Sequence, residues 1–302
     1  MSPDPLERGQ IVVVGGALVD VRATARAGWT PGVSLPGTVR ILPGGSGRNV
    51  AVDLARLGHR VALLSAVGTD PLGDWLLQVT SAAGVEVGHV RRTARTGLFV
   101  SVGPPDGEAW CVADAGGIEN LAVDDLGAWR PLVETAALVI SDANLSETAQ
   151  RALAAMVGER PRVLLATSPA KAPRLRPVLP GAAVVVCNRA EALALTGLPP
   201  TLSWQALAAA LLTDGVACVV ITQGRSGVGI VTAQEEAFAP AREVEVVDPT
   251  GAGDAVAAVA AHAHLAGMEP DRTAHLAAEA ASLAVRSEDN TPADLAAVLQ
   301  RT

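Results

Sequence analysis

The sequence predicts an α/β fold with an open, mostly parallel central sheet flanked by helices, together with a small β-sheet lid. Short apolar runs typical of buried strands alternate with helical patterns along most of the chain, and glycine-rich or polar loops follow many of these runs. Strands that alternate with helices pair in parallel through right-handed crossovers. Two strand-like runs about a turn interrupt this alternation. We therefore expect a single domain over residues 1–302, with lid strands at about 34–42 and 97–113.

Composition and charge narrow the classes of function. The chain has 302 residues, 49% of them hydrophobic, but its long apolar stretches are soon interrupted and predict no membrane span. The N-terminus lacks the apolar core of a secretory signal, and three cysteines without metal-binding spacing fit a reduced cytoplasmic protein. A net charge of −8 argues against a nucleic-acid polymer as partner. The only lysine, Lys171, lies in no Walker-type sequence, which excludes a P-loop.

The first buried strand begins at Ile11 and ends in Gly15-Gly16, and Asp20 lies just beyond it. The glycine pair lacks the GxGxxG spacing, so a nicotinamide-dependent oxidoreductase is poorly supported. The Asp20 carboxylate could accept hydrogen bonds from two vicinal hydroxyls of a sugar. The alternative is an ordinary turn residue.

A glycine-rich stretch, Pro43-Gly-Gly-Ser-Gly-Arg-Asn49, precedes a helical pattern over residues 50–57. Gly44 and Gly45 allow a ligand to approach the backbone closely, and Asn49 offers both a donor and an acceptor. The alternative is a plain loop-to-helix junction.

The middle of the N-terminal half repeats the same rhythm, with a strand over 61–67 and a helix over 74–83. Strand-like runs at 97–102 and 108–112 then flank a turn that contains an Asp-Gly pair, which predicts a hairpin. Together with residues 34–42 this hairpin could form a small sheet that covers a site. The alternative is an ordinary surface hairpin.

From residue 136 onward, strands again end in polar loops. Because the carboxyl ends of the strands in an open parallel sheet meet at one edge, we expect the polar residues that follow them to converge there. The residues concerned are Asp142 and Asn144, Asn188 and Glu191, and Thr222 to Gly224. For Asn188 and Glu191 the alternative is simple helix capping.

The stretch Asp248-Pro-Thr-Gly-Ala-Gly-Asp254 lies between a strand-like segment, 244–247, and a long alanine-rich helical pattern. Glycines at 251 and 253 allow a tight turn, and the first turn of a helix exposes unpaired N–H groups that suit a phosphoryl group. Asp254 would lie beside that group and could take a proton from an attacking hydroxyl. The alternative is a helix start with an acid that complements the helix dipole.

Four motifs in order resemble those of the ribokinase-like (PfkB) family of carbohydrate and nucleoside kinases, over essentially the whole chain. Two are the signature stretches Gly44-Gly-Ser-Gly-Arg-Asn49 and Asp248 to Asp254. The others are Asn188-Arg-Ala-Glu191, which matches NxxE, and Thr222-Gln-Gly-Arg-Ser-Gly227, which matches TxGxxG. The resemblance implies an ATP-dependent phosphotransferase that acts on an alcohol group.

The resemblance also implies roles for individual residues. Asp254 would be the catalytic base, and the backbone amides of Gly251, Ala252, Gly253 and Asp254 would form an anion hole. The implied substrate contacts are Asp20, Gly44, Gly45 and Asn49 for the sugar, with Asp114 and Asn144 as candidates for the rest of a nucleoside. The implied nucleotide contacts are Asn188, Glu191, Thr222, Gly224 and Gly227.

The expected cofactors are ATP and Mg²⁺, with Glu191 reaching the metal through water, and a monovalent cation such as K⁺. A homodimer formed through the lid is the expected assembly. One motif departs from the family. Thr167-Ser-Pro169 stands where an Asp-Pro or Asn-Pro pair is common, so a nucleotide or metal contact there is expected to be weakened or replaced.

Within the family, the resemblance extends to the members that phosphorylate pseudouridine. The GGxGRN form of the first motif, Leu63 to Asp70, Ser141 to Ser146 and, more loosely, Glu288 to Leu295 carry it. The expected acceptor is therefore the 5′-hydroxyl of pseudouridine. The alternatives are a kinase for ribose, a ketohexose or a purine nucleoside, and a non-catalytic nucleoside-binding protein on the same fold.

Overall fold

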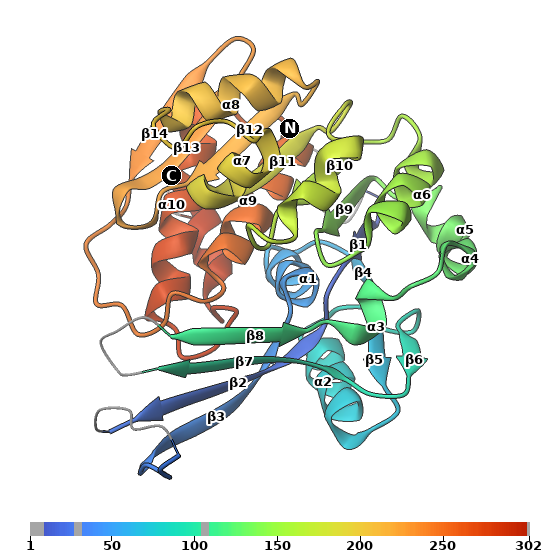
Figure 1. Ribbon diagram of the computed structural model, residues 1–302. Helices are drawn as coiled ribbons and strands as arrows, with labels where there is room; N and C mark the ends of the chain where they lie inside the picture. Colours follow the sequence, from blue (N-terminus) through green and yellow to red (C-terminus); the bar gives the residue numbers. More distant parts are fainter. Residues whose placement is uncertain (1–8, 27–31, 104–108, 301–302) are drawn as a thin grey trace.

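The computed structural model describes residues 9–26, 32–103 and 109–300. The centre of the molecule is an eight-stranded sheet with the strand order β14-β13-β12-β11-β10-β9-β1-β4 (Figure 1). The pairs from β4 to β12 are parallel, and β13 and β14 add an antiparallel edge. The strands are β1 Ile11–Val14, β4 Val61–Leu64, β9 Leu138–Asp142, β10 Arg162–Leu165, β11 Val184–Asn188, β12 Cys218–Thr222, β13 Gly227–Thr232 and β14 Glu236–Pro240. This arrangement confirms the predicted fold class.

Helices cover both faces of this sheet because successive residues of each buried strand point to opposite sides. Val13 of β1 packs in the cluster that contains α1, α9 and α10, whereas Val12 and Val14 pack in the cluster on the other face. The helices are α1 Ser46–Arg56, α2 Pro71–Ala82, α3 Gly116–Glu119, α4 Val123–Leu126, α5 Arg130–Val133, α6 Glu147–Val157, α7 Arg189–Thr196, α8 Trp204–Thr213, α9 Ala252–Ala266 and α10 Pro270–Arg286. Short 3₁₀ turns add η1 Gly127–Trp129, η2 Ala172–Val178, η3 Gly224–Ser226 and η4 Leu295–Gln300. None of the helices in the described residues is long and apolar enough to cross a membrane.

A second, four-stranded sheet with the order β3-β2-β7-β8 forms the lid and projects from the α/β body (Figure 1). Its strands are β2 Leu18–Ala25, β3 Gly37–Gly44, β7 Gly97–Gly103 and β8 Trp110–Asp114. The strand expected at 34–42 thus lies two to three residues further along and includes Gly44. The turn of the expected hairpin, residues 104–107, lies outside the described residues. A small pair, β5 Ala66–Gly68 and β6 Arg91–Thr93, lies beside α2.

The expected position of Asp20 was wrong. A strand does end at Gly15-Gly16, but a new strand, β2, begins at Leu18, so Asp20 lies inside the lid sheet instead of in a loop beyond the central sheet. The crowding at the glycine pair explains the break. A Cβ atom on Gly15 would lie 2.5 Å from an oxygen of Asp142, and only glycine lets the chain pass that carboxylate.

The strand expected at 244–247 is also absent from the structure. Residues 241–250 form no strand, and Val247 is half exposed. The N–H groups of Val247 and Asp248 donate instead to the carbonyl oxygen of Val285, at the end of α10. The alternating pattern therefore reflects attachment to a helix end, not pairing with the central sheet.

Candidate active site

The predicted anion site lies at the N-terminus of α9. Gly251 is the N-cap residue and has a φ of 86°, a left-handed conformation that favours glycine. A Cβ atom at this position would also lie 2.1 Å from the carbonyl oxygen of Asn290. Gly253, by contrast, faces open space, with no atom within 4 Å of an added Cβ. The amides at this helix start therefore have room beside them for a bound group.

Asp254 lies in the first turn of α9 and is held by α1. Its Oδ2 accepts a hydrogen bond of 2.8 Å from Nδ2 of Asn49. Although the residue is partly exposed, its carboxyl group has lost most of its contact with water, and this desolvation raises its pKa to about 7. Hydrogen bonds from Asn49 and Ser46 act in the opposite direction, and the nearby carboxylates of Asp142 and Asp20 add to the rise.

Asn49 is itself fixed by its neighbour Arg48. The Arg48 guanidinium is buried and donates to Oδ1 of Asn49 at 3.0 Å, to the Thr80 hydroxyl at 3.2 Å and to the Pro43 carbonyl at 3.4 Å. Burial lowers the pKa of Arg48 to about 10, so the side chain stays charged at neutral pH. Arg48 therefore orients Asn49, and so fixes the direction from which Asn49 donates to Asp254.

Asp142 joins the end of β9 to the start of α1. Its Oδ2 accepts from the backbone N–H groups of Gly16 at 2.8 Å and Gly47 at 2.9 Å, and its Oδ1 accepts from the N–H of Asn144 at 2.9 Å. Burial raises the pKa of Asp142, and these N–H donors act against that rise. The carboxylate is a structural clamp that brings the β1–β2 turn and the first turn of α1 together.

Asn144 lies beside the same turn, because a Cβ atom on Gly16 would come within 2.7 Å of its Nδ2. Its Oδ1 accepts a hydrogen bond of 2.7 Å from Nζ of Lys171. The acceptor of Asn144 is thus already used by a side chain from the loop after β10.

Asp20 is buried on the lid strand β2 and meets the C-terminal part of the chain. Its Oδ2 accepts a hydrogen bond of 2.8 Å from Nδ2 of Asn290, which donates to the carbonyl of Pro43 at 2.9 Å as well. Burial raises the pKa of Asp20, while Asn290 and Arg22 act in the opposite direction. Gly44 lies directly against this carboxylate, since a Cβ atom there would come within 2.1 Å of Oδ1.

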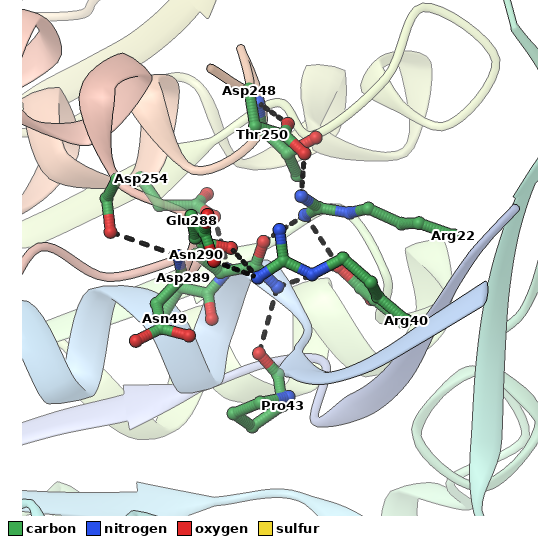
Figure 2. Close-up of polar contacts among 12 residues, drawn as sticks. Arg22, Arg40, Pro43, Asn49, Asp248, Thr250, Asp254, Glu288, Asp289 and Asn290 are labelled. Atoms are coloured by element: carbon green, nitrogen blue, oxygen red, sulfur yellow. Dashed lines mark hydrogen bonds and ion pairs between the residues drawn. The ribbon is translucent and has the colours of Figure 1, made fainter. Parts of the chain in front are cut away.

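Arg22, two residues further along β2, ties the lid to the motif before α9. Its guanidinium binds the carboxylate of Asp248 and the side-chain oxygen of Asn290 (Figure 2). Asp248 in turn accepts from the N–H of Thr250 at 2.8 Å. The lid, the 287–291 segment and the loop before α9 therefore form one connected polar network.

Asp114 lies apart from this network, at the base of the lid. Its Oδ2 pairs with Arg95 at 2.8 Å, and its Oδ1 accepts from the N–H of Gly116 at 3.0 Å. Its carboxylate oxygens are thus engaged with Arg95, which precedes β7, and with Gly116, the first residue of α3.

On the other side of α9, Asn188 and Glu191 form a capping box at the start of α7. Oδ1 of Asn188 accepts from the N–H of Glu191 at 2.9 Å, and Oε2 of Glu191 accepts from the N–H of Asn188 at 2.8 Å. Burial raises the pKa of Glu191 despite these hydrogen bonds. The capping alternative therefore describes the local geometry, and it leaves Oε1 of Glu191 and the Nδ2 group of Asn188 for other partners.

The TxGxxG motif forms the turn between β12 and β13. Thr222 is the last residue of β12, and Gly224 has a φ of 55°. Gly227 has a φ of 132°, and a Cβ atom there would lie 2.1 Å from the carbonyl oxygen of Ala239. Both glycines are thus needed for the turn itself, which follows the strand next to the one that ends at Asn188.

The geometry joins a helix N-terminus, a carboxyl group with a pKa near neutrality and a lid. The chain matches the model of the pfkB family carbohydrate kinases over residues 8–295. This chain is a member of the pfkB family of carbohydrate kinases. The kinase is 29% identical to pseudouridine kinase of Escherichia coli over 96% of this chain and 94% of that protein. It is 31% identical to mouse ribokinase over 82% of this chain and 79% of that protein.

Solved structures agree with this assignment. The kinase superposes on ribokinase of Arabidopsis thaliana, solved in complex with ribose and ATP, with a TM-score of 0.82 and 25% identity, covering 97% of this chain and 98% of that chain. As a family member, the kinase is a phosphotransferase that uses ATP and acts on an alcohol group of a small sugar or nucleoside.

Several positioning roles at the site were not found from sequence. Asn290, Arg22 and Arg48 position the predicted site residues and received no such role, whereas Asp142 was expected at this edge of the sheet but not as a clamp. A signal existed for Asn290, since the 288–295 stretch took part in the resemblance to pseudouridine-phosphorylating members. For the buried Arg48 and Asp142, local sequence carries no sign of the distant groups that they bind.

Proposed function

We propose that this kinase transfers the γ-phosphoryl group of ATP to O5′ of pseudouridine, with Asp254 as the general base. The observation that carries the proposal is the Asp254 carboxyl group at the start of α9, fixed by Asn49 and with its pKa raised to about 7. Such a group is partly ionised at neutral pH and can accept a proton from an attacking hydroxyl. The 29% identity to pseudouridine kinase over nearly the whole chain supports the choice of nucleoside.

The backbone amides of residues 251–254 form the proposed anion hole. Phosphoryl transfer depends mainly on alignment and on stabilisation of the charge on the transferred group. The left-handed Gly251 turns the chain into α9, whose first N–H groups have no partners within the helix. Ala252 and Gly253 contribute two of these amides, and the space beside Gly253 is open. These groups would stabilise the charge that develops in the transition state.

The sugar would be held between the lid and α1. Asp20, Gly44, Gly45 and Asn49 are the proposed contacts, and the Asp20–Asn290 and Asn49–Asp254 hydrogen bonds support their position on one side of α9. Asp114 and Asn144 are the proposed contacts further along the nucleoside. Because the Oδ1 of Asn144 is engaged by Lys171, its contribution to a nucleoside would come through its Nδ2 group.

The nucleotide side would comprise Asn188, Glu191, Thr222, Gly224 and Gly227. Among the described residues no cluster of three or more His, Cys, Asp or Glu side chains could hold a metal ion. Mg²⁺ commonly keeps several waters and binds phosphates with one or two carboxylates, and the buried Glu191 fits such a role through water. When bound with ATP, the metal neutralises phosphate charge. Assays that omit Mg²⁺ or K⁺ in turn test both cations, because full activity without one of them would show that the reaction does not require that cation.

Asn290 offers a test of the proposed sugar site. In Asn290→Ala the buried Asp20 carboxylate loses a hydrogen-bond donor, and the KM for the acceptor should rise about tenfold, since leaving a buried polar group unpaired costs about 1–3 kcal/mol. Arg40→Ala is the matched control, because Arg40 also connects the lid to the 287–291 segment but pairs with the exposed Glu288. Steady-state kinetics should show little change in the control. An unchanged KM in Asn290→Ala would argue against an acceptor site at Asp20.

The lid is also the proposed surface of a homodimer. Cross-strand register aligns two apolar rows on the face opposite Asp20 and Arg22, because neighbouring strand residues point to opposite faces. The rows are Val39–Ala23–Val102–Trp110 and Ile41–Val21–Val100–Val112. Val39, Ile41, Trp110 and Val112 are each more than half exposed. A second copy of the same sheet would cover this face.

Light scattering tests this assembly. Val112→Asp places a charge within the apolar face, on the edge strand β8, and should convert a dimer into a monomer. Val123→Asp, at an exposed position on α4 away from the lid, is the control and should leave the mass unchanged. A monomeric wild-type protein would contradict the proposal.

A substrate panel tests the function itself. Pseudouridine, uridine, purine nucleosides, ribose and ketohexoses are compared with ATP and Mg²⁺ by kcat/KM, and pseudouridine should rank first. Ribose is the second candidate, because mouse and Arabidopsis ribokinases match most of the chain. The absence of any phosphorylated product across the panel would favour a non-catalytic nucleoside-binding protein.

The three free thiols, Cys111, Cys187 and Cys218, are consistent with a reducing cytoplasmic location.

A further inference from the structure

Lys171, the only lysine of the chain, lies at the carboxyl edge of the central sheet. It follows β10, which lies between β9 and β11 in the sheet. β9 leads to Asn144 on the side of the acceptor, and β11 ends at Asn188 on the side of the nucleotide. The loop after β10 therefore lies between the two halves of the proposed site.

The ammonium group of Lys171 is held in place without being neutralised. Nζ donates to the neutral Oδ1 of Asn144 at 2.7 Å, and within the described part of the chain no carboxylate lies within 4.0 Å of it. Arg174, which also reaches the backbone of Asn144, differs from Lys171 because it is paired with Glu119. An ammonium group has three donors, so Lys171 keeps capacity to bind a further acceptor.

The loop that carries Lys171 shows two further signs of a ligand site. Thr167 has a φ of 56°, the one non-glycine residue with positive φ in the described parts of the chain. Its Oγ1 is buried, and no hydrogen-bond partner occurs for it among the described residues. Strained backbone and unpaired buried polar groups both occur preferentially at functional sites.

We propose that Lys171 binds the phosphate chain of the nucleotide substrate and that Asn144 positions it. The inference rests on the proposed arrangement of nucleotide and acceptor about α9. A nucleoside or sugar acceptor is neutral and offers no charge to replace the water around an ammonium group, whereas the triphosphate is a strong anion. The lysine would thereby supply a positive charge on the loop where Thr167-Ser-Pro169 replaces the usual Asp-Pro or Asn-Pro.

Nucleotide binding measured without any acceptor tests this directly. Isothermal titration of Lys171→Met with Mg²⁺ and a non-hydrolysable ATP analogue should show an affinity at least about tenfold lower than that of the wild type, as expected for a lost charge-assisted hydrogen bond. Adenosine, which lacks phosphates, should bind equally to both proteins. Lys171→Arg should recover part of the loss. Arg130→Met removes one charge from an exposed pair on α5 and is the matched control.

Asn144→Asp adds a readout for the positioning role. The carboxylate has nearly the same shape as the amide and would neutralise Lys171, so the analogue should again bind more weakly while adenosine does not. Circular dichroism and thermal unfolding verify that each variant is folded.

The uniqueness of Lys171 permits a second experiment on the unaltered protein. The α-amino group is the only other primary amine, so acetic anhydride labelling at one internal site can be followed by mass spectrometry. The Mg²⁺ complex of the ATP analogue should protect Lys171, whereas pseudouridine or ribose alone should not.

Two results would overturn the proposal. One is unchanged affinity for the analogue in Lys171→Met together with no protection. The other is protection by the acceptor and a raised acceptor KM, which would assign Lys171 to the acceptor instead. The first result is measured without any acceptor, so this inference and the proposed function can fail separately.

Discussion

Asp254→Asn should reduce kcat by about 10² or more while the protein folds and binds ATP nearly as the wild type does. The replacement amide keeps the size of the side chain and can still accept the hydrogen bond from Asn49, which measures 2.8 Å in the structure. It cannot accept a proton from a hydroxyl. Single-turnover kinetics with the best acceptor measure the chemical step, and a titration with a non-hydrolysable ATP analogue measures binding. Near-normal turnover would remove Asp254 from the role of base.

The pH dependence of the wild type gives the same test without a mutation. A base works only when it is ionised, and burial raises the pKa of Asp254 to about 7. The turnover rate should therefore fall as the pH decreases through about 7, and it should level off above that value. In Asp254→Asn the residual rate should lose this acid limb. An acid limb retained unchanged in the variant would assign the titration to another group.

Gly251→Ala should lower turnover by a similar factor, about 10², and should also destabilise the fold. A left-handed conformation costs a residue with a side chain roughly 1–2 kcal/mol, and the added Cβ would meet the Asn290 carbonyl oxygen at 2.1 Å. The turn must move, and a shift of about 1 Å in a catalytic group can cost about 10² in rate. Gly253→Ala is the matched control for folding, since its Cβ would enter open space.

Thermal unfolding and steady-state kinetics separate the two glycines. Gly251→Ala should unfold at a lower temperature than the wild type, whereas Gly253→Ala should unfold at nearly the same temperature. Equal stability and equal activity in Gly251→Ala would show that the turn before α9 does not set the position of the amides.

Much of the fold was accessible from sequence because its determinants are local. Apolar runs such as residues 11–14 and 138–142 are short and end in polar or glycine residues, so both the strand and the loop that follows are visible. The region that failed, 244–247, shows the limit of that reasoning. Its alternation is real, but its N–H groups bind the end of a helix that lies far along the chain. Local periodicity contains no information on that partner.

The same distinction applies to the site. The residues found from sequence, such as Asn49 and Asp254, lie in short motifs with a recognisable spacing. Asn290 and Asp20 are 270 positions apart, and only the folded chain brings them within 2.8 Å. Asp142 follows a predicted strand, but its role as a clamp depends on two glycine N–H groups on other segments.

The position of Asp20 on β2 has a consequence for the order of events. This carboxylate belongs to the lid sheet, whereas Asp254 belongs to the α/β body, so in the proposed function the inclination of the lid to the body would set the distance between acceptor and base. An acceptor bound to both would act as a bridge that draws them together. The Arg22–Asp248 pair already joins the two parts, and an acceptor would add a second connection that a water molecule in the same site could not supply. The kinase would in this way use its acceptor as the trigger that limits wasteful hydrolysis of ATP.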